Sequence, residues 1–298
     1  MPSSVAERTL VLHPGAIGDV LLAIPALRAL PHPIEIAAQS HIGALLVALG
    51  AAARARAFDS LGVDALFTDE PLDGAPVARH IRAAGRVVCW FGARDARFVD
   101  RMRALSPDAV VALPASPPHL VWRHLLDTVG GAADTTPIVV TPELVERGRA
   151  SLRAIGWDGR SRVLVVHPGA GGVAKRWPAD GFADVIRDVD ATVVVNDGPA
   201  DSDAVDALIA RSSRPLLRLT RPELPALAGV LALASYLGND SGVSHLAATV
   251  GAPSVVLFTE AARPWAPWSP AARCLTVTTS RIDDGERRIV AAALSDLR

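Results

Sequence analysis

The sequence predicts an α/β protein made of two Rossmann-like domains, each with a doubly wound parallel sheet. Two observations carry this prediction. The stretch Arg8–Gly18 reappears as Arg162–Gly172, 154 positions later, with eight of eleven residues identical. Short apolar runs also alternate with helical patterns in both halves, largely without hairpin signals between them. Parallel strands joined by helical crossovers produce that alternation.

Each copy of the repeated stretch reads as an apolar strand, a His-Pro-Gly turn and the start of a helix. This is the first strand-turn-helix unit of a doubly wound domain. Because the copies open the two halves of the chain, we expect domains at 1–135 and 136–298, joined by a Thr- and Pro-rich connector at 132–142. The last helix is free to return to the first domain. Ligands of such folds bind at the carboxyl ends of the strands, which for two facing domains means the cleft between them.

Apolar and helical patterns place the remaining elements. Strands are expected at 34–38, 63–67, 86–91 and 109–113 in the first half, and at 191–196, 215–219, 236–238 and 254–258 in the second. Helices are expected at 19–30 and 75–84, and then at 179–189, 201–210, 222–234 and 241–250.

Composition narrows the function. The net charge of −1 argues against a general nucleic-acid binder. No apolar run has the ~18–20 residues of a membrane span, and the first nine residues lack the apolar core of a signal peptide. Cys89 and Cys274 stand in unrelated contexts, which indicates reduced thiols of a cytosolic protein and neither a disulfide nor a metal site. No His, Cys and Asp cluster has metal-ligand spacing, so no metal is expected.

The chain has 29 arginines and one lysine, Lys175, which follows the Gly-rich turn containing Gly171 and Gly172. Such loops bind phosphates through backbone N–H groups, and a lysine adds a compact positive charge. The alternative is a surface lysine without a role. In the first copy Asp19 stands where the second has Val173. Asp19 is either a helix cap or a base that accepts a proton from a substrate hydroxyl.

A second small-residue turn, Asn239–Gly242, follows an expected strand and opens a helix that carries His245. Asp240 is a candidate cap, and Ser241 and Gly242 offer N–H groups where the helix dipole favours an anion. With Lys175 they form a possible two-sided clamp for a diphosphate. The alternative for His245 is a buried histidine bonded to backbone.

Two further features have both a structural and a functional interpretation. Asp201, just after an expected strand, either binds ribose hydroxyls or caps a helix. A run of arginines makes the middle of the first half basic; it is either a solvated face or a surface for an anionic acceptor or acidic membrane. The run comprises Arg79, Arg82, Arg86, Arg94, Arg97, Arg101 and Arg103. Trp177, next to Pro178, is expected to pack in the core.

Together the turn ending in Gly18-Asp19 with Pro25 beyond it, the segment 167–178 with Lys175, and the Asn-Asp-Ser-Gly turn with His245 resemble glycosyltransferase family nine. These are the lipopolysaccharide heptosyltransferases and their relatives. The resemblance runs from about Leu10 to Pro270 and is strongest in the second half. His13 and the loop before Lys175, which lacks Ser and Thr, depart from many relatives.

The resemblance implies a GT-B architecture and inverting, metal-independent sugar transfer from a nucleotide-diphospho-sugar, with ADP-heptose as the best-known donor. By resemblance, Asp19 is the general base and Lys175 neutralises the diphosphate. Ser241, Gly242 and His245 complete the phosphate site, Asp240 holds sugar hydroxyls, and Asp201 lies near the ribose. The implied acceptor is an anionic glycan or glycolipid such as the lipopolysaccharide core, reached in the cytoplasm, with possible peripheral contact to the inner membrane.

Two other functions remain open at the level of sequence. A nucleotide-sugar 2-epimerase shares the GT-B plan and would turn over the donor alone. A non-catalytic sugar-nucleotide binder would depend on Lys175 and be indifferent to Asp19. A dinucleotide dehydrogenase is disfavoured, because neither turn gives G-x-G-x-x-G with an acid at the next strand end.

Overall fold

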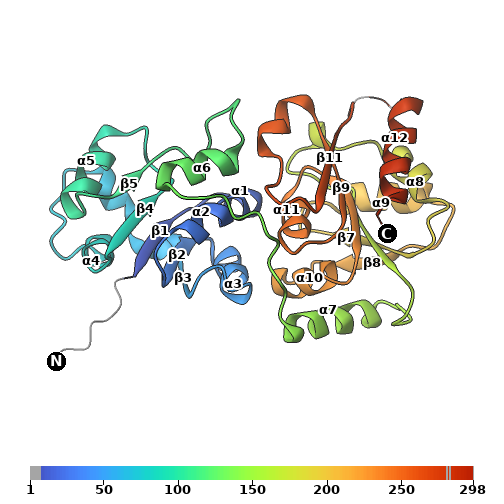
Figure 1. Ribbon diagram of the computed structural model, residues 1–298, viewed down its shortest axis with the longest axis horizontal. Coiled ribbons are helices and arrows are strands. Elements are labelled where there is room, and N and C mark those ends of the chain that lie inside the picture. Colours follow the sequence, from blue (N-terminus) through green and yellow to red (C-terminus); the bar gives the residue numbers. More distant parts are fainter. Residues whose placement is uncertain (1–7, 280, 282, 298) are drawn as a thin grey trace. The chain divides into compact units, whose positions relative to one another are not determined.

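The computed structural model describes residues 8–279, 281 and 283–297. The chain divides into two compact units, Met1–Asp134 and Thr135–Arg298, which we call the N-terminal and C-terminal units. Each unit contains its own sheet with helices packed around it (Figure 1). All strand pairs in both sheets are parallel, as the alternating pattern predicted.

The N-terminal sheet has the order β3-β2-β1-β4-β5. Its strands are β1 (Thr9–Leu12), β2 (Ile34–Ala38), β3 (Arg54–Ala57), β4 (Arg86–Cys89) and β5 (Val110–Val111). Its helices are α1 (Ile17–Leu22), α2 (Ile24–Ala29), α3 (Ser40–Ala48), α4 (Pro76–Arg82), α5 (Ala96–Leu105) and α6 (Val121–Val129), with 3₁₀ turns η1 (Phe58–Leu61) and η2 (Val63–Phe67).

The C-terminal sheet has the order β11-β10-β9-β6-β7-β8, the doubly wound order in which the first strand is central. Its strands are β6 (Val163–His167), β7 (Thr192–Asp197), β8 (Leu217–Thr220), β9 (Ser235–Asn239), β10 (Ser254–Phe258) and β11 (Ala272–Thr276). Its helices are α7 (Pro142–Ala154), α8 (Ala179–Ile186), α9 (Ser202–Arg211), α10 (Leu224–Leu231), α11 (Gly242–Thr249) and α12 (Asp284–Ser295), with 3₁₀ turns η3 (Val173–Lys175) and η4 (Glu260–Trp265).

The prediction of a strand at 63–67 is wrong, because these residues form the 3₁₀ turn η2. Val63 and Leu66 are its buried side chains, and their spacing of three matches one face of a 3₁₀ turn. The strand that pairs with β2 is instead β3, whose Arg-Ala-Arg-Ala sequence has low β propensity. A sheet edge tolerates such a sequence because its neighbours supply the pairing.

The helix predicted at 19–30 is divided at Ala23 into α1 and α2. Pro25 lies in the first turn of α2, where its missing N–H is harmless, whereas inside one continuous helix it would break the hydrogen-bond ladder. Helices α3, α5, α6, α7 and α12 and strand β11 lie where no element was predicted.

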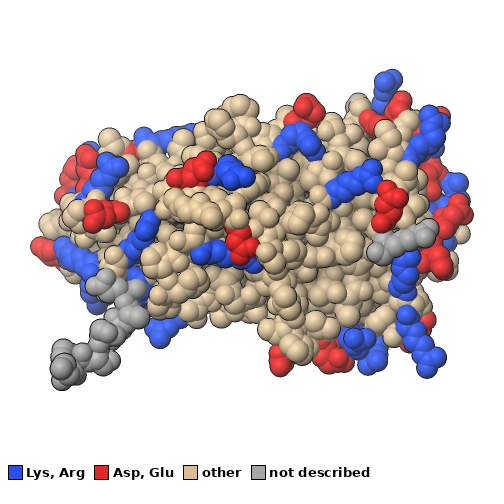
Figure 2. Space-filling view, in the orientation of Figure 1, with Lys and Arg blue, Asp and Glu red and all other residues tan. Residues whose placement is uncertain are grey.

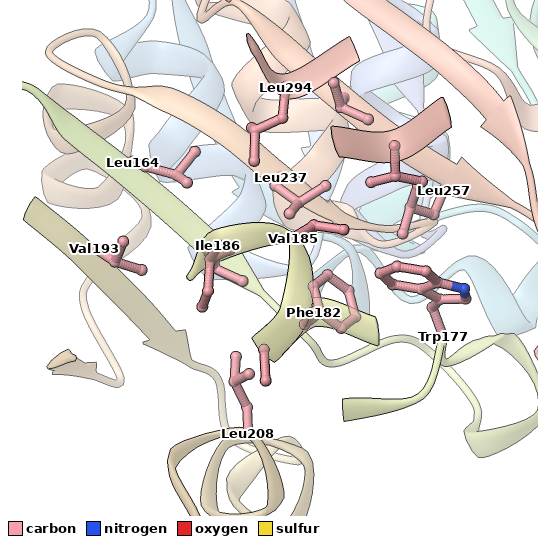
Figure 3. Packing of buried hydrophobic residues seen from close by; sticks show 14 of the residues in the cluster. Leu164, Trp177, Phe182, Val185, Ile186, Val193, Leu208, Leu237, Leu257 and Leu294 are labelled. Atoms are coloured by element: carbon pink, nitrogen blue, oxygen red, sulfur yellow. The ribbon is translucent and has the colours of Figure 1, made fainter. Parts of the chain in front are cut away.

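The C-terminal core lies between the sheet and helices α8, α9 and α12 (Figure 3). Trp177 is fully buried there with its ring edge against Phe182, 5.3 Å between centroids, which confirms the expectation that it packs. The last helix, α12, places Val290, Ala293 and Leu294 in this same core.

Helices α7 and α10 cross at two glycines. A Cβ on Gly229 would lie 1.8 Å from the carbonyl oxygen of Leu144, and one on Gly148 would lie 2.1 Å from the Gly229 carbonyl carbon. Only glycine permits this approach of the two backbones. Among the described residues, no helix combines the length and apolarity that crossing a bilayer requires. Cys89 and Cys274 are both free; Cys89 is buried and Cys274 is half-buried.

Candidate active site

The carboxyl-terminal edge of the C-terminal sheet collects polar residues from three neighbouring strands. His167 ends β6, Asp197 ends β7 and Asn239 ends β9. His167 lies level with Gly238 in the register of β6 and β9. Because parallel strands end at a common edge, residues more than 60 positions apart in sequence (Pro168 and Asn239 are 71 apart) become neighbours.

Asn239 attaches the loop that carries Lys175 to the end of β9. Its amide nitrogen Nδ2 donates to the carbonyl oxygen of Pro168 at 2.8 Å, and its Oδ1 accepts from the backbone N–H of Trp177 at 3.0 Å. Both ends of the loop are therefore held by one buried side chain. The exposed residues between them include Gly171 and Gly172, where an added Cβ would meet nothing within 4 Å.

Lys175 binds the carboxylate of Asp240. Its Nζ lies 2.7 Å from Oδ2, and the other carboxylate oxygen, Oδ1, lies 3.6 Å from Nε2 of His245. Asp240 and His245 are buried, while the Lys175 side chain is 45% exposed. The lysine thus reaches from a half-exposed position onto a buried acid.

Opposing effects set the pKa of Asp240. Burial raises it, but hydrogen bonds and charge from His245 and Lys175 outweigh burial and hold the pKa below its ordinary value. Asp240 is therefore a stable anion at neutral pH. It serves as an acceptor for Lys175 and for hydroxyl donors, and it is a poor general acid.

The start of α11 is organised by serines. Ser241 is the N-cap, and its Oγ accepts from the backbone N–H of Ser244. The hydroxyl of Ser244 lies 2.8 Å from the hydroxyl of buried Tyr236 and donates to the carbonyl oxygen of Asn239 at 2.5 Å. These hydrogen bonds fix the turn at the start of α11. The N–H groups of Gly242 and Val243 lie at the positive end of the helix dipole. The cap is Ser241, not Asp240.

Asp201 occupies the N-cap position of α9 without making a capping bond, so the capping interpretation of its side chain is wrong. Its carboxylate lies against two glycines instead: a Cβ on Gly169 would be 2.1 Å from Oδ1, and one on Gly198 would be 2.4 Å from Oδ2. His167 Nε2 is 3.7 Å from Oδ2 and Arg176 is 3.9 Å from Oδ1. Asp201 is therefore buried beneath the Gly-rich loop.

Asp197, the acid at the end of β7, binds Arg218 and Ser202. Arg218 donates to its Oδ2 from Nε at 2.9 Å and from a terminal nitrogen at 2.7 Å, and Ser202 donates to Oδ1 at 3.1 Å. In doubly wound folds the ribose is bound by an acid close to this position. Arg218 occupies the Asp197 carboxylate, whereas the Asp201 carboxylate lies next to the glycine of the His-Pro-Gly turn. Asp201 is therefore the better candidate for a ribose ligand.

In the N-terminal unit Asp19 is the third residue of α1, whose N-cap is Ala16. Asp19 is therefore not the cap. Gly15 separates it from His13: a Cβ on Gly15 would lie 2.8 Å from His13 Cε1 and 3.1 Å from Asp19 Cβ. Asp19 belongs to the N-terminal unit, whereas all the other predicted site residues belong to the C-terminal unit.

The basic run of the N-terminal unit is partly neutralised by the acidic loop 69–73. Arg97 pairs with Asp69 at 3.2 Å, Arg82 with Asp73 at 3.6 Å, and Arg101 donates to the carbonyl oxygen of Glu70. Where Figure 1 shows α4 and α5, Figure 2 shows acidic and basic side chains intermixed. The surface formed by the basic run is thus less positively charged than the arginines alone would suggest.

Sequence reasoning did not single out Asn239's tethering role, or His167 and Gly169 as neighbours of Asp201. The repeated His-Pro-Gly turn carried a signal for the last two. Among the described residues, no group of three or more His, Cys, Asp or Glu side chains is arranged to hold a metal ion.

The family model for glycosyltransferase family 9 (heptosyltransferase) matches residues 98–289. A search of curated proteins found no match. Among solved structures, a family 9 glycosyl transferase from Veillonella parvula DSM 2008 is 18% identical, with a TM-score of 0.76 and coverage of 98% of this chain and 97% of that one.

Two heptosyltransferases of E. coli share the fold. ADP-heptose lipopolysaccharide heptosyltransferase II is 18% identical, with a TM-score of 0.73 and coverage of 97% and 98% of the two chains. A heptosyltransferase solved with ADP is 16% identical, with a TM-score of 0.67 and coverage of 98% and 100%. Since the family model spans well over half of a chain whose two parallel sheets match these structures end to end, the chain belongs to glycosyltransferase family 9 and is a glycosyltransferase.

Proposed function

We propose that this enzyme transfers a heptose from ADP-heptose to a glycan acceptor such as the lipopolysaccharide core, with inversion and without a metal cofactor. The observation that carries the proposal is the cluster of Lys175, Asp240 and His245 beside the start of α11. It combines a cation, N–H donors and a buried carboxylate, which are the groups that a sugar diphosphate needs.

On the donor side, Lys175 and the N–H groups of Gly242 and Val243 receive the diphosphate, with the backbone of Gly171 and Gly172 as further donors. In the leaving ADP, negative charge grows on the phosphate oxygen next to the sugar. A fixed cation and an oriented helix dipole stabilise that charge without reorganising. Asp240 is then released from Lys175 to accept sugar hydroxyls, while His245 continues to support it.

Asp201 is proposed to bind the ribose hydroxyls of the donor. Its support is the absence of a capping bond and its position under Gly169, together with the engagement of Asp197 by Arg218. A carboxylate accepts hydrogen bonds from two adjacent hydroxyls, which suits a ribose.

On the acceptor side, Asp19 is proposed to remove the proton from the attacking hydroxyl. An inverting displacement breaks the bond from the sugar to ADP while the acceptor oxygen attacks from the opposite face, so the base and the leaving group belong to different sets of residues. The assignment of Asp19 to one unit and the diphosphate groups to the other agrees with that division.

The choice of ADP and heptose is supported by relatives alone: one structure is titled an ADP-heptose heptosyltransferase and another was solved with ADP. We further propose that the enzyme works in the cytoplasm with peripheral contact to the inner membrane. The arginines of the basic run that the acidic loop 69–73 leaves unengaged favour an anionic glycolipid acceptor.

The test combines binding and transfer. Calorimetric titration with ADP, UDP, GDP and dTDP is expected to show preference for ADP, and preference for another nucleotide would refute the donor assignment. Transfer from ADP-heptose to lipid A–Kdo is expected for the wild type. Asp19→Asn is expected to lower kcat by roughly 10²–10⁴-fold with unchanged ADP affinity. Turnover of donor without acceptor would indicate an epimerase instead.

A further inference from the structure

His13 lies in the His-Pro-Gly turn of the N-terminal unit, at the end of β1, and is 1% exposed. Its ring nitrogen Nδ1 accepts from the backbone N–H of Gly15 at 3.3 Å. The turn is also held from β2, because Gln39 donates to the carbonyl oxygens of Pro14 and Gly15 at 3.4 and 3.3 Å. The imidazole is therefore held in a fixed position by hydrogen bonding within the turn.

The protonation state of His13 follows from this geometry. Burial lowers its pKa to about 4, although the charge of Asp19 acts to raise it. The ring is thus neutral at physiological pH, and because Nδ1 is an acceptor the single proton is on Nε2. Nε2 is buried and has no hydrogen-bond partner among the described residues. A buried donor without a partner is costly unless a ligand or a movable side chain uses it.

Asp19 is our candidate acceptor for that donor. Its Cβ and the Cε1 of His13 both lie within about 3 Å of the point where Gly15 lacks a side chain (3.1 and 2.8 Å). The charge of Asp19 and a hydrogen bond with its main chain both act to raise the pKa of His13. On another side the ring meets Trp90 edge-on, 5.7 Å between centroids, and Trp90 is fixed by a 2.9 Å bond to Thr128 of α6.

We propose that His13 is a positioning residue for Asp19: its neutral imidazole, protonated on Nε2, lies beside Asp19 across Gly15 and orients the carboxylate for proton abstraction. This rests on the proposed role of Asp19 as the base. A neutral donor suits the task better than a cation, because a cation beside the carboxylate would stabilise its anionic form and weaken it as a base.

The C-terminal unit contains a related arrangement with a different acid, in which Nδ1 of His167 lies 3.2 Å from both the carbonyl oxygen and the side-chain nitrogen of Asn196. His167 ends β6, is buried, and has Nε2 3.7 Å from Asp201, whose carboxylate lies against Gly169 of the second His-Pro-Gly turn. In both turns the glycine leaves the space that the acid uses. The two histidines therefore provide matched variants that act on opposite substrates of one reaction.

The experiment uses two substitutions at each histidine. In His13→Asn the amide oxygen replaces the Nδ1 acceptor and the Nε2 donor is lost, whereas His13→Gln restores a donor near Nε2. We expect His13→Asn to lower kcat about tenfold or more with the donor KM changed less than about twofold. His13→Gln should recover most of that loss. For His167→Asn the main effect should instead be a higher donor KM.

Two results would overturn the proposal: a wild-type kcat in His13→Asn, or a His13→Gln enzyme no better than His13→Asn. A purely structural role would lower the stability of both variants without lowering kcat more than it changes the donor KM. Thermal unfolding of each variant measures the stability.

The wild-type protein allows a test that needs neither a stable variant at His13 nor activity. Long-range nitrogen–proton NMR at pH 7 should show His13 as the Nε2–H tautomer, and Asp19→Asn should shift that signal while Asp95→Asn, at the cap of α5, should not. An Nδ1–H tautomer, or no response to Asp19→Asn, rejects the proposal. If the enzyme transfers no sugar while these NMR results hold, the proposed function fails and the His13–Asp19 coupling stands.

Discussion

The single lysine of the chain is bound to a buried acid: Nζ of Lys175 lies 2.7 Å from Oδ2 of Asp240. The two residues come from separate turns, 65 positions apart. The ammonium is therefore held in place by a carboxylate. Diphosphate binding would replace one anionic partner with another, so the lysine is preorganised before the donor arrives.

Replacing Lys175 with alanine is expected to weaken ADP binding about tenfold or more, about 1.4 kcal/mol, because a charge-assisted contact to the diphosphate is lost. Calorimetric titration measures the affinity. Arg149→Ala, which removes an exposed pair with Glu146 on α7, is the control and should leave the affinity unchanged. Equal affinities for wild type and Lys175→Ala would remove the lysine from the donor site.

Replacing Gly169 with alanine is expected to displace Asp201, since the new Cβ would lie 2.1 Å from its Oδ1. ADP affinity should fall as a result. Asp201→Ala removes the clashing carboxylate, so adding Gly169→Ala to it should cost little more. Titration of the four proteins of this double-mutant cycle gives the coupling, and additive losses would show that the glycine acts independently of Asp201.

Replacing Gly229 with alanine is expected to destabilise the C-terminal unit by about 1–3 kcal/mol, because the methyl group would collide with the backbone of α7. Urea unfolding measures the loss. Gly171→Ala places its methyl group in open space and should leave the free energy of unfolding nearly unchanged. A Gly229→Ala protein as stable as Gly171→Ala would mean that the two helices separate easily.

The stability of the N-terminal unit is expected to depend on the protonation of His13. Its pKa is lowered from 6.5 to about 4, so between these values the unfolded chain binds a proton that the folded chain does not. The free energy of unfolding should therefore fall as pH drops from 6.5 toward 4, by about 3 kcal/mol at most, and change little further from this cause below pH 4.

Urea unfolding of wild type and His13→Asn across this pH range checks the prediction. The difference between the two proteins isolates His13 from other buried histidines such as His167, whose pKa burial also lowers. Parallel pH curves for the two proteins would show that His13 titrates normally.

Prediction from sequence succeeded where periodicity and turn chemistry act locally. Strands β2 and β10 begin and end where predicted, since each is a short apolar run bounded by turn residues. It failed at β3 and η2, where a weak strand former lies at a sheet edge and an apolar run forms a 3₁₀ turn. In both cases contacts with the rest of the unit override local propensity.

The sequence by itself determined that the protein has two similar domains, because an apolar strand followed by a His-Pro-Gly turn forms the same strand-turn-helix unit wherever it occurs. It also determined the residue types at the strand ends. Only the tertiary structure decided their partners: Lys175 meets Asp240, Arg218 binds Asp197 across 21 positions, and Asp201 lies beneath Gly169 without capping its helix. Such pairings depend on which strand ends become neighbours, and strand order is a property of the folded sheet.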